Sequence, residues 1–146
     1  MRALVQRVKE ASVSVGGKQV STIDVGLLVL VGISHEDRER DADWLAEKVV
    51  RLRIFEDGSG KMSHDVMTVG GSLLVVSQFT LYGATRKGRR PDFSAAATGA
   101  SARPLYDYFV QACQSHWDRV KTGLFGQAMD VKLVNWGPVT LWLESP

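Results

Sequence analysis

A short apolar run in the first quarter of the chain limits the architectures that this sequence can adopt. After Gly26, residues 27–31 are all apolar, and Gly32 and Ile33 follow. A run of strand length without polar positions is typical of a central strand, which is buried on both faces. The run is far shorter than the roughly 20 apolar residues needed to cross a bilayer. The neighbours of this strand must therefore include both sheet and helix.

Strands are also predicted on both sides of this run in the sequence. Residues 11–15 alternate between apolar residues and serine, Gly16-Gly17 follow, and a short run continues over residues 19–23. This pattern is typical of a β-hairpin with one buried face. Residues 73–81 form a second apolar strand whose C-terminal half turns polar. Because polar groups at the carboxyl end of a buried strand commonly lie in clefts, this end is a candidate site.

Two helices are predicted from apolar spacing. Apolar residues recur every three or four positions over residues 44–52, and Ser101 with Pro104 opens a second helix. The face predicted for the second helix comprises Leu105, Tyr108, Phe109, Ala112 and Cys113. A chain of 146 residues, 45% of them hydrophobic, has the size and composition of one globular domain. We therefore predict an α+β fold in a single domain, residues 1–146, with largely antiparallel sheets forming a barrel-like core and two main packing helices.

Cys113 is the only cysteine in the sequence. No internal disulfide or cysteine-rich zinc site can form, which fits a reducing compartment. Its place on an apolar helix face predicts a buried structural thiol. The first residues of the chain lack the apolar segment of a secretion signal. We expect a soluble, cytoplasmic protein with no membrane partner.

The sequence contains no standard catalytic or cofactor motif. The three histidines, His35, His64 and His116, lack the spacing of metal ligands. The glycine pairs lack the fixed spacing and following helix of a nucleotide-binding loop. The turn at residues 56–61 lacks the spaced acidic ligands of a calcium loop. We therefore expect neither a metal nor a cofactor.

Thr80 is the one hydroxyl at the polar strand end that resembles a nucleophile. It follows Ser77 and Gln78 closely in the sequence. A threonine nucleophile needs a base within hydrogen-bond reach, and no nearby residue supplies one. We favour a role for Thr80 in positioning a ligand over a role as nucleophile.

Four cations occur together after this strand, in the sequence Arg86-Lys87-Gly88-Arg89-Arg90-Pro91. A charged loop of this kind is often only solvated. Glycine-spaced cations beside a cleft also suit the phosphates of a nucleic acid. The net charge of +2 is too small to favour either interpretation. Both stay open on the residues alone.

A Gly137-Pro138 step interrupts the last apolar segment of the chain. Proline cannot donate to a β-ladder, so the step marks an edge, a bulge or a tight turn. Such a step either shapes a corner or presents backbone to a ligand. The dipeptide by itself does not separate these two interpretations.

Four motifs, in this order, resemble the D-aminoacyl-tRNA deacylase family. They are Ser77-Gln78-Phe79-Thr80-Leu81, Lys87-Gly88-Arg89-Arg90-Pro91-Asp92-Phe93, Thr122-Gly123 with Phe125-Gly126, and Asn135 with Gly137-Pro138-Val139-Thr140. The resemblance covers essentially the whole chain. Long motifs in the right order are far more specific than a single tripeptide.

The resemblance implies an editing enzyme that hydrolyses the ester joining a D-amino acid, or glycine, to the 3′ end of tRNA. It also implies a homodimer in which Gly137-Pro138, in cis, enters the active site of the partner. The carbonyl oxygens of this step would face the substrate's α-amino group and leave no room for an L side chain. Glycine has no side chain to exclude, so the same filter would admit it.

The resemblance also assigns site residues. The catalytic wall would be formed by Ser77, Gln78, Phe79 and Thr80, with main-chain N–H groups around Phe79 and Thr80 holding the scissile carbonyl. A positioned water, helped by the terminal ribose hydroxyl of the tRNA, would then suffice without a protein nucleophile. The residues expected to bind aminoacyl-tRNA are Arg86, Lys87, Arg89 and Arg90.

Two positions depart from the family's usual pattern. Trp136 stands where a small or acidic residue is expected, and residues 63–65 follow the pattern only in part. Two alternative functions are a non-catalytic tRNA-binding module and a synthetase-type editing domain that acts on L-seryl-tRNA. Deacylation of tRNAs carrying D-, L- and glycyl groups separates all three.

Overall fold

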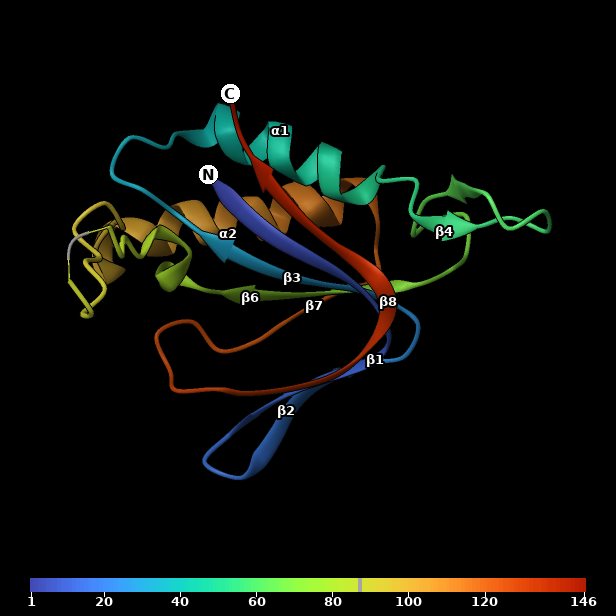
Figure 1. Cartoon of the computed structure of the whole chain (residues 1–146), viewed down its shortest axis with the longest axis horizontal. Helices are drawn as coiled ribbons and strands as arrows, with labels where there is room; N and C mark the ends of the chain where they lie inside the picture. The colour runs from blue at the N-terminus through green and yellow to red at the C-terminus, as the bar shows by residue number, and fades with distance from the viewer. Residues whose placement is uncertain (87) are drawn as a thin grey trace.

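The computed structural model describes residues 1–86 and 88–146, so Lys87, predicted above to bind tRNA, lies outside the described residues. Figure 1 shows helices α1 and α2 lying over the sheet, with both termini near α1. The elements in chain order are β1 (Arg2–Val15), β2 (Lys18–Ile23), β3 (Gly26–Gly32), α1 (Glu39–Val50), β4 (Phe55–Glu56), β5 (Met62–His64), β6 (Ser72–Ser77), a 3₁₀ helix η1 (Phe79–Tyr82), α2 (Gly99–His116), β7 (Val120–Thr122) and β8 (Asp130–Glu144).

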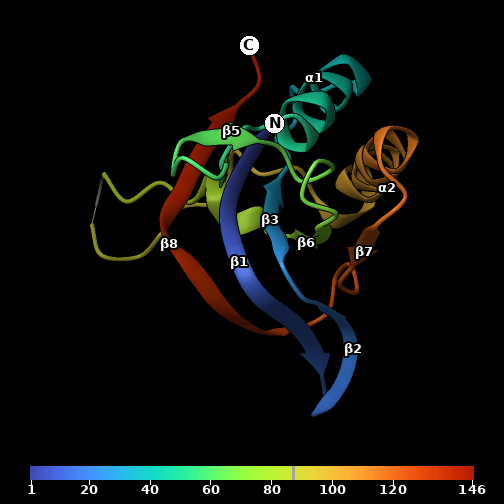
Figure 2. The ribbon, with the colours of Figure 1, turned by 90° about the vertical axis from the view of Figure 1, so that its right-hand side faces the viewer.

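The main sheet is mixed and strongly curled. Its order is β2-β1-β3-β6-β7, and β8 pairs with the other edge of β1. The pairings of β1 with β2, β3 and β8 are antiparallel, whereas β3–β6 and β6–β7 are parallel. In Figure 2 both helices lie on one side of the curled sheet. The predicted α+β domain with a barrel-like core and two packing helices is confirmed, with two parallel pairings added.

The central position of β3 follows from its apolar sequence. The side chains of Leu27, Leu28 and Val29 are at most 1% exposed, because helices cover one face of the strand and the curled sheet covers the other. At the start of β3, a Cβ on Gly26 would lie 1.9 Å from the carbonyl oxygen of Ser72. Only glycine therefore lets β3 and β6 pair at this position.

Two predicted boundaries are wrong. The strand predicted over residues 73–81 ends at Ser77, and the chain then turns into η1. Helix α2 begins at Gly99 rather than near Ser101, because the carbonyl of Thr98 accepts the first helical hydrogen bonds. The buried face of α2 also differs from the predicted one, since of the predicted residues only Phe109 and Cys113 are buried, and the face comprises Ala102, Tyr106, Phe109, Val110 and Cys113.

Cys113 is fully buried on that face, as predicted for a structural thiol. Burial raises the pKa of the Cys113 thiol to about 12, so the thiol stays protonated at pH 8. We expect iodoacetamide to leave native protein unmodified at pH 8 over a period that labels urea-unfolded protein completely. Mass spectrometry measures the label, and rapid labelling of the native state would contradict this burial.

Candidate active site

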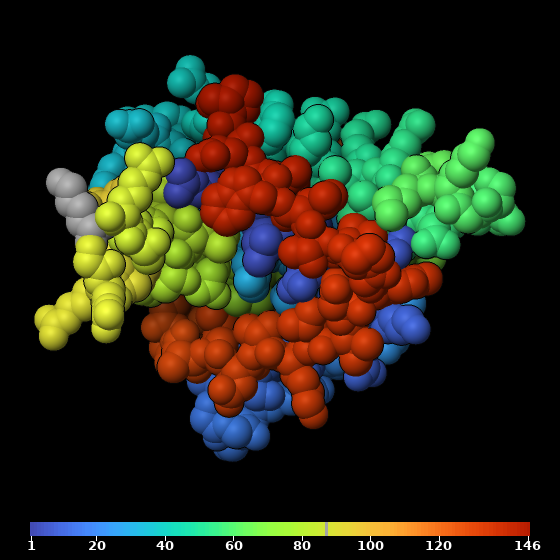
Figure 3. All heavy atoms as spheres, in the orientation of Figure 1, coloured from blue at the N-terminus to red at the C-terminus, as the bar shows by residue number. Residues whose placement is uncertain are grey.

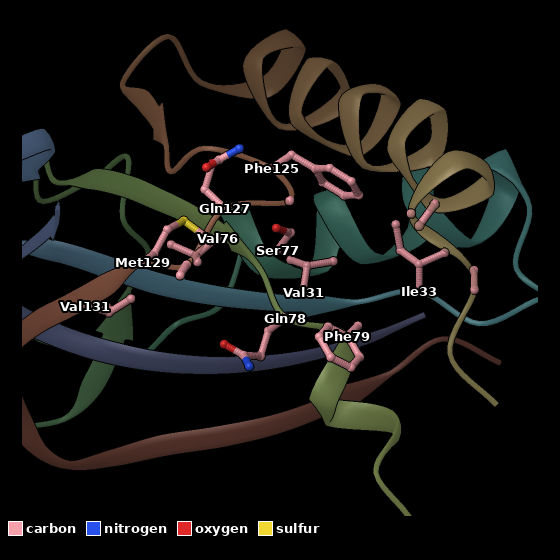
Figure 4. A pocket seen from close by; sticks show the side chains of 15 residues that line it. Val31, Ile33, Val76, Ser77, Gln78, Phe79, Phe125, Gln127, Met129 and Val131 are labelled. Carbon is pink, nitrogen blue, oxygen red and sulfur yellow. The ribbon is translucent and has the colours of Figure 1, made fainter. Parts of the chain in front are cut away.

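A cavity of about 600 Å³ opens where β6 ends. Its floor is formed by the ends of β3 and β6, and its walls by the start of α2 and the segment between β7 and β8. The lining residues are Val31, Ile33, Val76, Ser77, Gln78, Phe79, Ala97, Gly99, Ala102, Phe125, Gly126, Gln127, Ala128, Met129 and Val131. Figure 4 shows the Ser77 hydroxyl on the same side of the strand as Phe125. The polar end of β6 therefore lies in a cleft, as the sequence predicts.

The turn from β6 into η1 positions the backbone at the mouth of this cavity. The N–H of Gln78 donates to the carbonyl of Val31 at 2.7 Å, which is the last bond between these strands, and the N–H of Leu81 then donates to Gln78 at 3.2 Å. Gly32 makes room for the turn, because a Cβ there would lie 3.1 Å from the carbonyl oxygen of Gln78. The N–H groups at residues 79 and 80 begin a helical turn, so they have no intrahelical acceptors.

None of the residues found lining the cavity has an ionisable side chain. The nearest titratable group on η1 is Tyr82, whose hydroxyl donates to Asp37 at 3.3 Å. Burial, with a contribution from the Asp37 carboxylate, raises the pKa of Tyr82 to about 12. Tyr82 therefore stays protonated near neutral pH and is no general base. The cavity lining found in this chain offers backbone groups and neutral side chains to a ligand.

The structure brings three of the four predicted catalytic residues to the cavity. Ser77, Gln78 and Phe79 line it, but Thr80 does not. The Thr80 side chain is exposed, and its hydroxyl accepts a hydrogen bond from the Gln78 amide. Thr80 can thus orient Gln78 from outside the cavity.

Replacing Thr80 by alanine is expected to keep kcat/KM for a D-aminoacyl ester within about threefold of wild type, the effect of losing one neutral hydrogen bond. Single-turnover deacylation measures this effect. A loss of activity beyond 100-fold with normal tRNA binding would instead identify Thr80 as the nucleophile.

Three of the four predicted tRNA-binding cations are described by the structure, and none of the three lines the cavity. Arg86, Arg89 and Arg90 are exposed on a loop that is closed at its base by two hydrogen bonds between Ala84 and Asp92, of 2.8 and 2.9 Å. Within residues 1–86 and 88–146, none of these arginines lies within 4.0 Å of a carboxylate oxygen. Their positive charge is therefore available to a ligand.

Gly137 and Pro138 lie in a large bulge of strand β8. Gln6 of β1 pairs with Thr140 and Val8 pairs with Asn135, so four β8 residues lie opposite Arg7 alone. Both bulge residues are exposed, and the peptide bond between them is cis, the geometry that the resemblance implies. Figure 3 shows β8 running across one face of the molecule.

Arg7 and Asn135 hold the two ends of this bulge. The Arg7 side chain is 1% exposed, and it donates to the carbonyls of Trp136 at 3.0 Å and Ile54 at 2.7 Å. The Asn135 amide donates to the carbonyls of Arg7 and Val139, both at 3.1 Å. The carbonyls of Arg7, Trp136 and Val139 thus have side-chain donors in place of ladder partners. Gly137 and Pro138 are presented by a segment fixed on both sides.

Trp136 supports this segment from within. Its ring packs edge-on against Phe55 with centroids 6.4 Å apart, and the Arg7 guanidinium lies 4.8 Å from the ring centroid. The indole therefore points into its own chain and is part of the support of the bulge. The second departure, around His64, lies in the small β4–β5 hairpin, where His64 pairs with Phe55.

Gly137 and Pro138 do not line the cavity of their own chain. Sequence analysis also gave no role to Arg7 or to Met129, which lines the cavity. A signal for Arg7 was present, because it follows Ala3 and Val5 at every second position of an inward-facing strand. A charged residue at an inward-facing position of a strand indicates that buried groups of the protein bind its side chain.

No helix in the described residues is long and apolar enough to span a membrane. In the same part of the chain, no group of three or more His, Cys, Asp or Glu side chains is arranged to hold a metal ion.

Comparison with known proteins gives full-length matches. A family model described as D-Tyr-tRNA(Tyr) deacylase matches residues 4–144. A D-aminoacyl-tRNA deacylase of Thermus aquaticus is 57% identical over 145 residues, which are 99% of this chain and 95% of that protein. A D-aminoacyl-tRNA deacylase of Brevibacillus brevis strain 47 is 54% identical over 145 residues, which are 99% of this chain and 100% of that protein.

Two solved structures share the architecture over nearly the whole chain. One, titled c-Myc DNA Unwinding Element Binding Protein, has a TM-score of 0.95 and 44% identity and covers 100% of this chain and 99% of its own. The other, titled as a probable eukaryotic D-amino acid tRNA deacylase, has a TM-score of 0.85 and covers 98% of both chains. At 18% identity, the second match shows a common fold alone.

Proposed function

The chain belongs to the D-Tyr-tRNA(Tyr) deacylase family, and from this premise we propose how its cavity and its β8 bulge edit aminoacyl-tRNA. The protein is an ester hydrolase, a D-aminoacyl-tRNA deacylase. The mechanistic proposal is supported by the cavity lining at the end of β6, in which no ionisable side chain is found, and by η1, which starts there at Phe79 with N–H groups that lack intrahelical acceptors. An aminoacyl ester is already activated, so these donors and a positioned water are sufficient chemistry.

In this proposal the terminal adenosine and its aminoacyl group enter the cavity. The N–H groups of Phe79 and Thr80 hold the carbonyl oxygen of the ester as negative charge develops during attack by water. Preorganised donors of this kind contribute about 2.7–4 kcal/mol each in enzymes with an oxyanion hole. The terminal ribose hydroxyl of the tRNA assists the proton transfer, which agrees with the lack of a side-chain base.

We propose that discrimination comes from Gly137 and Pro138 of a second subunit. These residues are exposed in a rigid bulge and do not reach the cavity of their own chain, so another copy is needed to bring them there. Their carbonyl oxygens would accept hydrogen bonds from the α-amino group of the substrate. This contact leaves room for a D side chain or for glycine, but not for an L side chain.

A homodimer formed through β8 fits these requirements. In the described residues β8 pairs only with β1, so its other edge is open along 15 residues. Val134 and Trp142 of this strand are large apolar side chains that are 44% and 48% exposed. A two-fold interface over this face would bury them and give two equivalent sites. A cytoplasmic location, where aminoacyl-tRNA is used, belongs to the same proposal.

Deacylation time courses with D-tyrosyl-, L-tyrosyl-, glycyl- and L-seryl-tRNA test this function. We expect fast release of D-tyrosine and glycine and no acceleration with the two L esters. Equal hydrolysis of D- and L-tyrosyl-tRNA would contradict the chiral filter. Hydrolysis of L-seryl-tRNA would favour the synthetase-type editing alternative, and binding of tRNA without turnover would favour the binding-module alternative.

Reversing the charge of Arg89 and Arg90 to glutamate is expected to weaken tRNA binding. It should also reduce the slope of log K against log salt concentration by about one per lost phosphate contact. Binding is measured across a range of salt concentrations. The control carries glutamate at the exposed Lys18 and Arg51, far from the cavity, and should bind as wild type. Unchanged binding by the Arg89 and Arg90 variant would mean that the loop is only solvated.

A further inference from the structure

An exposed aromatic pair lies at the mouth of the cavity. Phe79 lines the cavity, yet 56% of its surface is exposed. The ring of Phe93 packs edge-on against it, with centroids 5.2 Å apart and an interplanar angle of 71°. Phe93 also packs against Gly83, where an added Cβ would lie 2.8 Å from the Phe93 ring. The Phe79 ring is therefore held in place while one side of it stays open to solvent.

The same pair joins the cavity to the cationic loop. Phe93 directly follows Asp92, whose hydrogen bonds with Ala84 close the loop that bears the exposed arginines. The carboxylate nearest in sequence to these arginines is that of Asp92, and it already accepts a hydrogen bond from the N–H of Ser94 at 2.8 Å. Phe93, which packs on the exposed Phe79 ring at the cavity, thus adjoins the base of the loop that carries the positive charge.

From this arrangement, and resting on the proposed function, we infer that Phe79 is the stacking site for the penultimate nucleotide of the tRNA. Arg89 and Arg90 would contact the phosphates that precede the terminal adenosine. The 3′ end of tRNA is single-stranded, and single strands are bound by exposed aromatic rings beside cationic grooves. Stacking tolerates any base, so this subsite adds affinity without restricting tRNA identity.

Two small substrates isolate this subsite. D-tyrosyl-adenosine carries only the nucleoside proposed for the cavity, whereas the D-tyrosyl ester of the dinucleotide CpA adds the penultimate base and one phosphate. Wild-type protein is expected to show a kcat/KM about tenfold higher for the dinucleotide ester, the effect of one stacked base. The Phe79→Leu variant should lose this preference, and Phe79→Tyr, which keeps the ring, should retain it.

A matched control is Leu124→Ala, which removes another exposed apolar side chain outside the cavity lining, 43% exposed in the native protein. It should keep the wild-type ratio. If Phe79→Leu fails to fold, Phe93→Leu serves as a second variant. It is expected to lower the ratio because the Phe79 ring would be held in place less well.

The outcomes separate the inference from the function on which it rests. Equal kcat/KM of wild-type protein for the two esters would overturn the subsite and leave the deacylase function intact. Loss of dimerisation in Phe79→Leu, with both esters affected equally, would identify the ring as a subunit contact and also overturn the subsite. Failure of wild-type protein to hydrolyse either D ester or D-tyrosyl-tRNA would contradict the proposed function itself.

Discussion

Replacing Gly137 by valine is expected to lower kcat/KM for D-tyrosyl-tRNA by about 100-fold or more, a barrier increase of about 2.7 kcal/mol, with a nearly unchanged Tm. The fold accommodates a Cβ here if the Asn135 side chain shifts by a few tenths of an ångström. A Cβ at this position would meet only the Asn135 side-chain oxygen, at 3.2 Å, and the residue is exposed on an edge strand. The substrate would have no such room, because its α-amino group has to approach the backbone at this position.

Lys18→Val is the control for this prediction. It introduces valine at an exposed position of β2, a different strand from the proposed β8 interface, and it should keep wild-type activity. The result that contradicts the proposal is an unfolded Gly137→Val protein whose residual folded fraction is fully active. Gly137 would then be needed only for the shape of the strand.

Replacing Arg7 by methionine is expected to lower the free energy of unfolding by about 3 kcal/mol and to reduce activity together with stability. Methionine keeps much of the buried volume but has no donors, so the carbonyls of Trp136 and Ile54 lose their partners. The Glu56 carboxylate, 3.6 Å from the guanidinium, also loses its counter-charge. Because Arg7 fixes one end of the bulge, Gly137 and Pro138 would no longer be held in one orientation.

Urea unfolding at a fixed protein concentration measures this change. The control is Arg51→Met, since Arg51 is 62% exposed and its pair with Glu47 lies on the helix surface, where such pairs contribute about 0.3–0.5 kcal/mol. A loss below about 1 kcal/mol for Arg7→Met would show that the bulge does not depend on this side chain.

The parts of the fold that were predicted correctly are those fixed by local pattern. The run after Gly26 was predicted to be a central strand because its residues are all apolar and are stabilised by burial on both faces of the sheet. The 3₁₀ turn at Phe79 was not predictable in this way. It depends on Gly32, which is 47 positions or more from the residues of η1 in sequence and makes room for them only in the folded state. The β3–β6 parallel pairing likewise depends on a contact across the chain, at Gly26.

The motifs of the candidate site were predictable from the sequence, but the contacts that hold these motifs in place were not. Ser77, Gln78 and Phe79 lie in the cavity because they end a buried strand. The proline predicted an edge, a bulge or a turn at Gly137, and the structure shows a bulge. Its stabilisation by Arg7 could not be predicted, because that requires knowing that β1 and β8 are paired with four residues opposite one. Trp136, which departs from the family pattern, is explained by its packing on Phe55.

The most direct test of the composite site is the activity of a mixed dimer. One chain carries Gly137→Val and has an intact cavity. The other carries Gly99→Trp, whose Cβ would have no atom within 4 Å and whose indole is expected to fill the cavity that Gly99 lines. A homodimer of either variant should be inactive, since the substitution blocks both of its active sites.

In the mixed dimer, the cavity of the first chain meets the partner's Gly137, which is intact. Differently tagged chains allow the mixed dimer to be purified, and its deacylation of D-tyrosyl-tRNA is then measured per dimer. The account predicts about half of the wild-type rate, because one of two equivalent sites is restored. A mixed dimer as inactive as its two parents would contradict a filter supplied across the subunit interface.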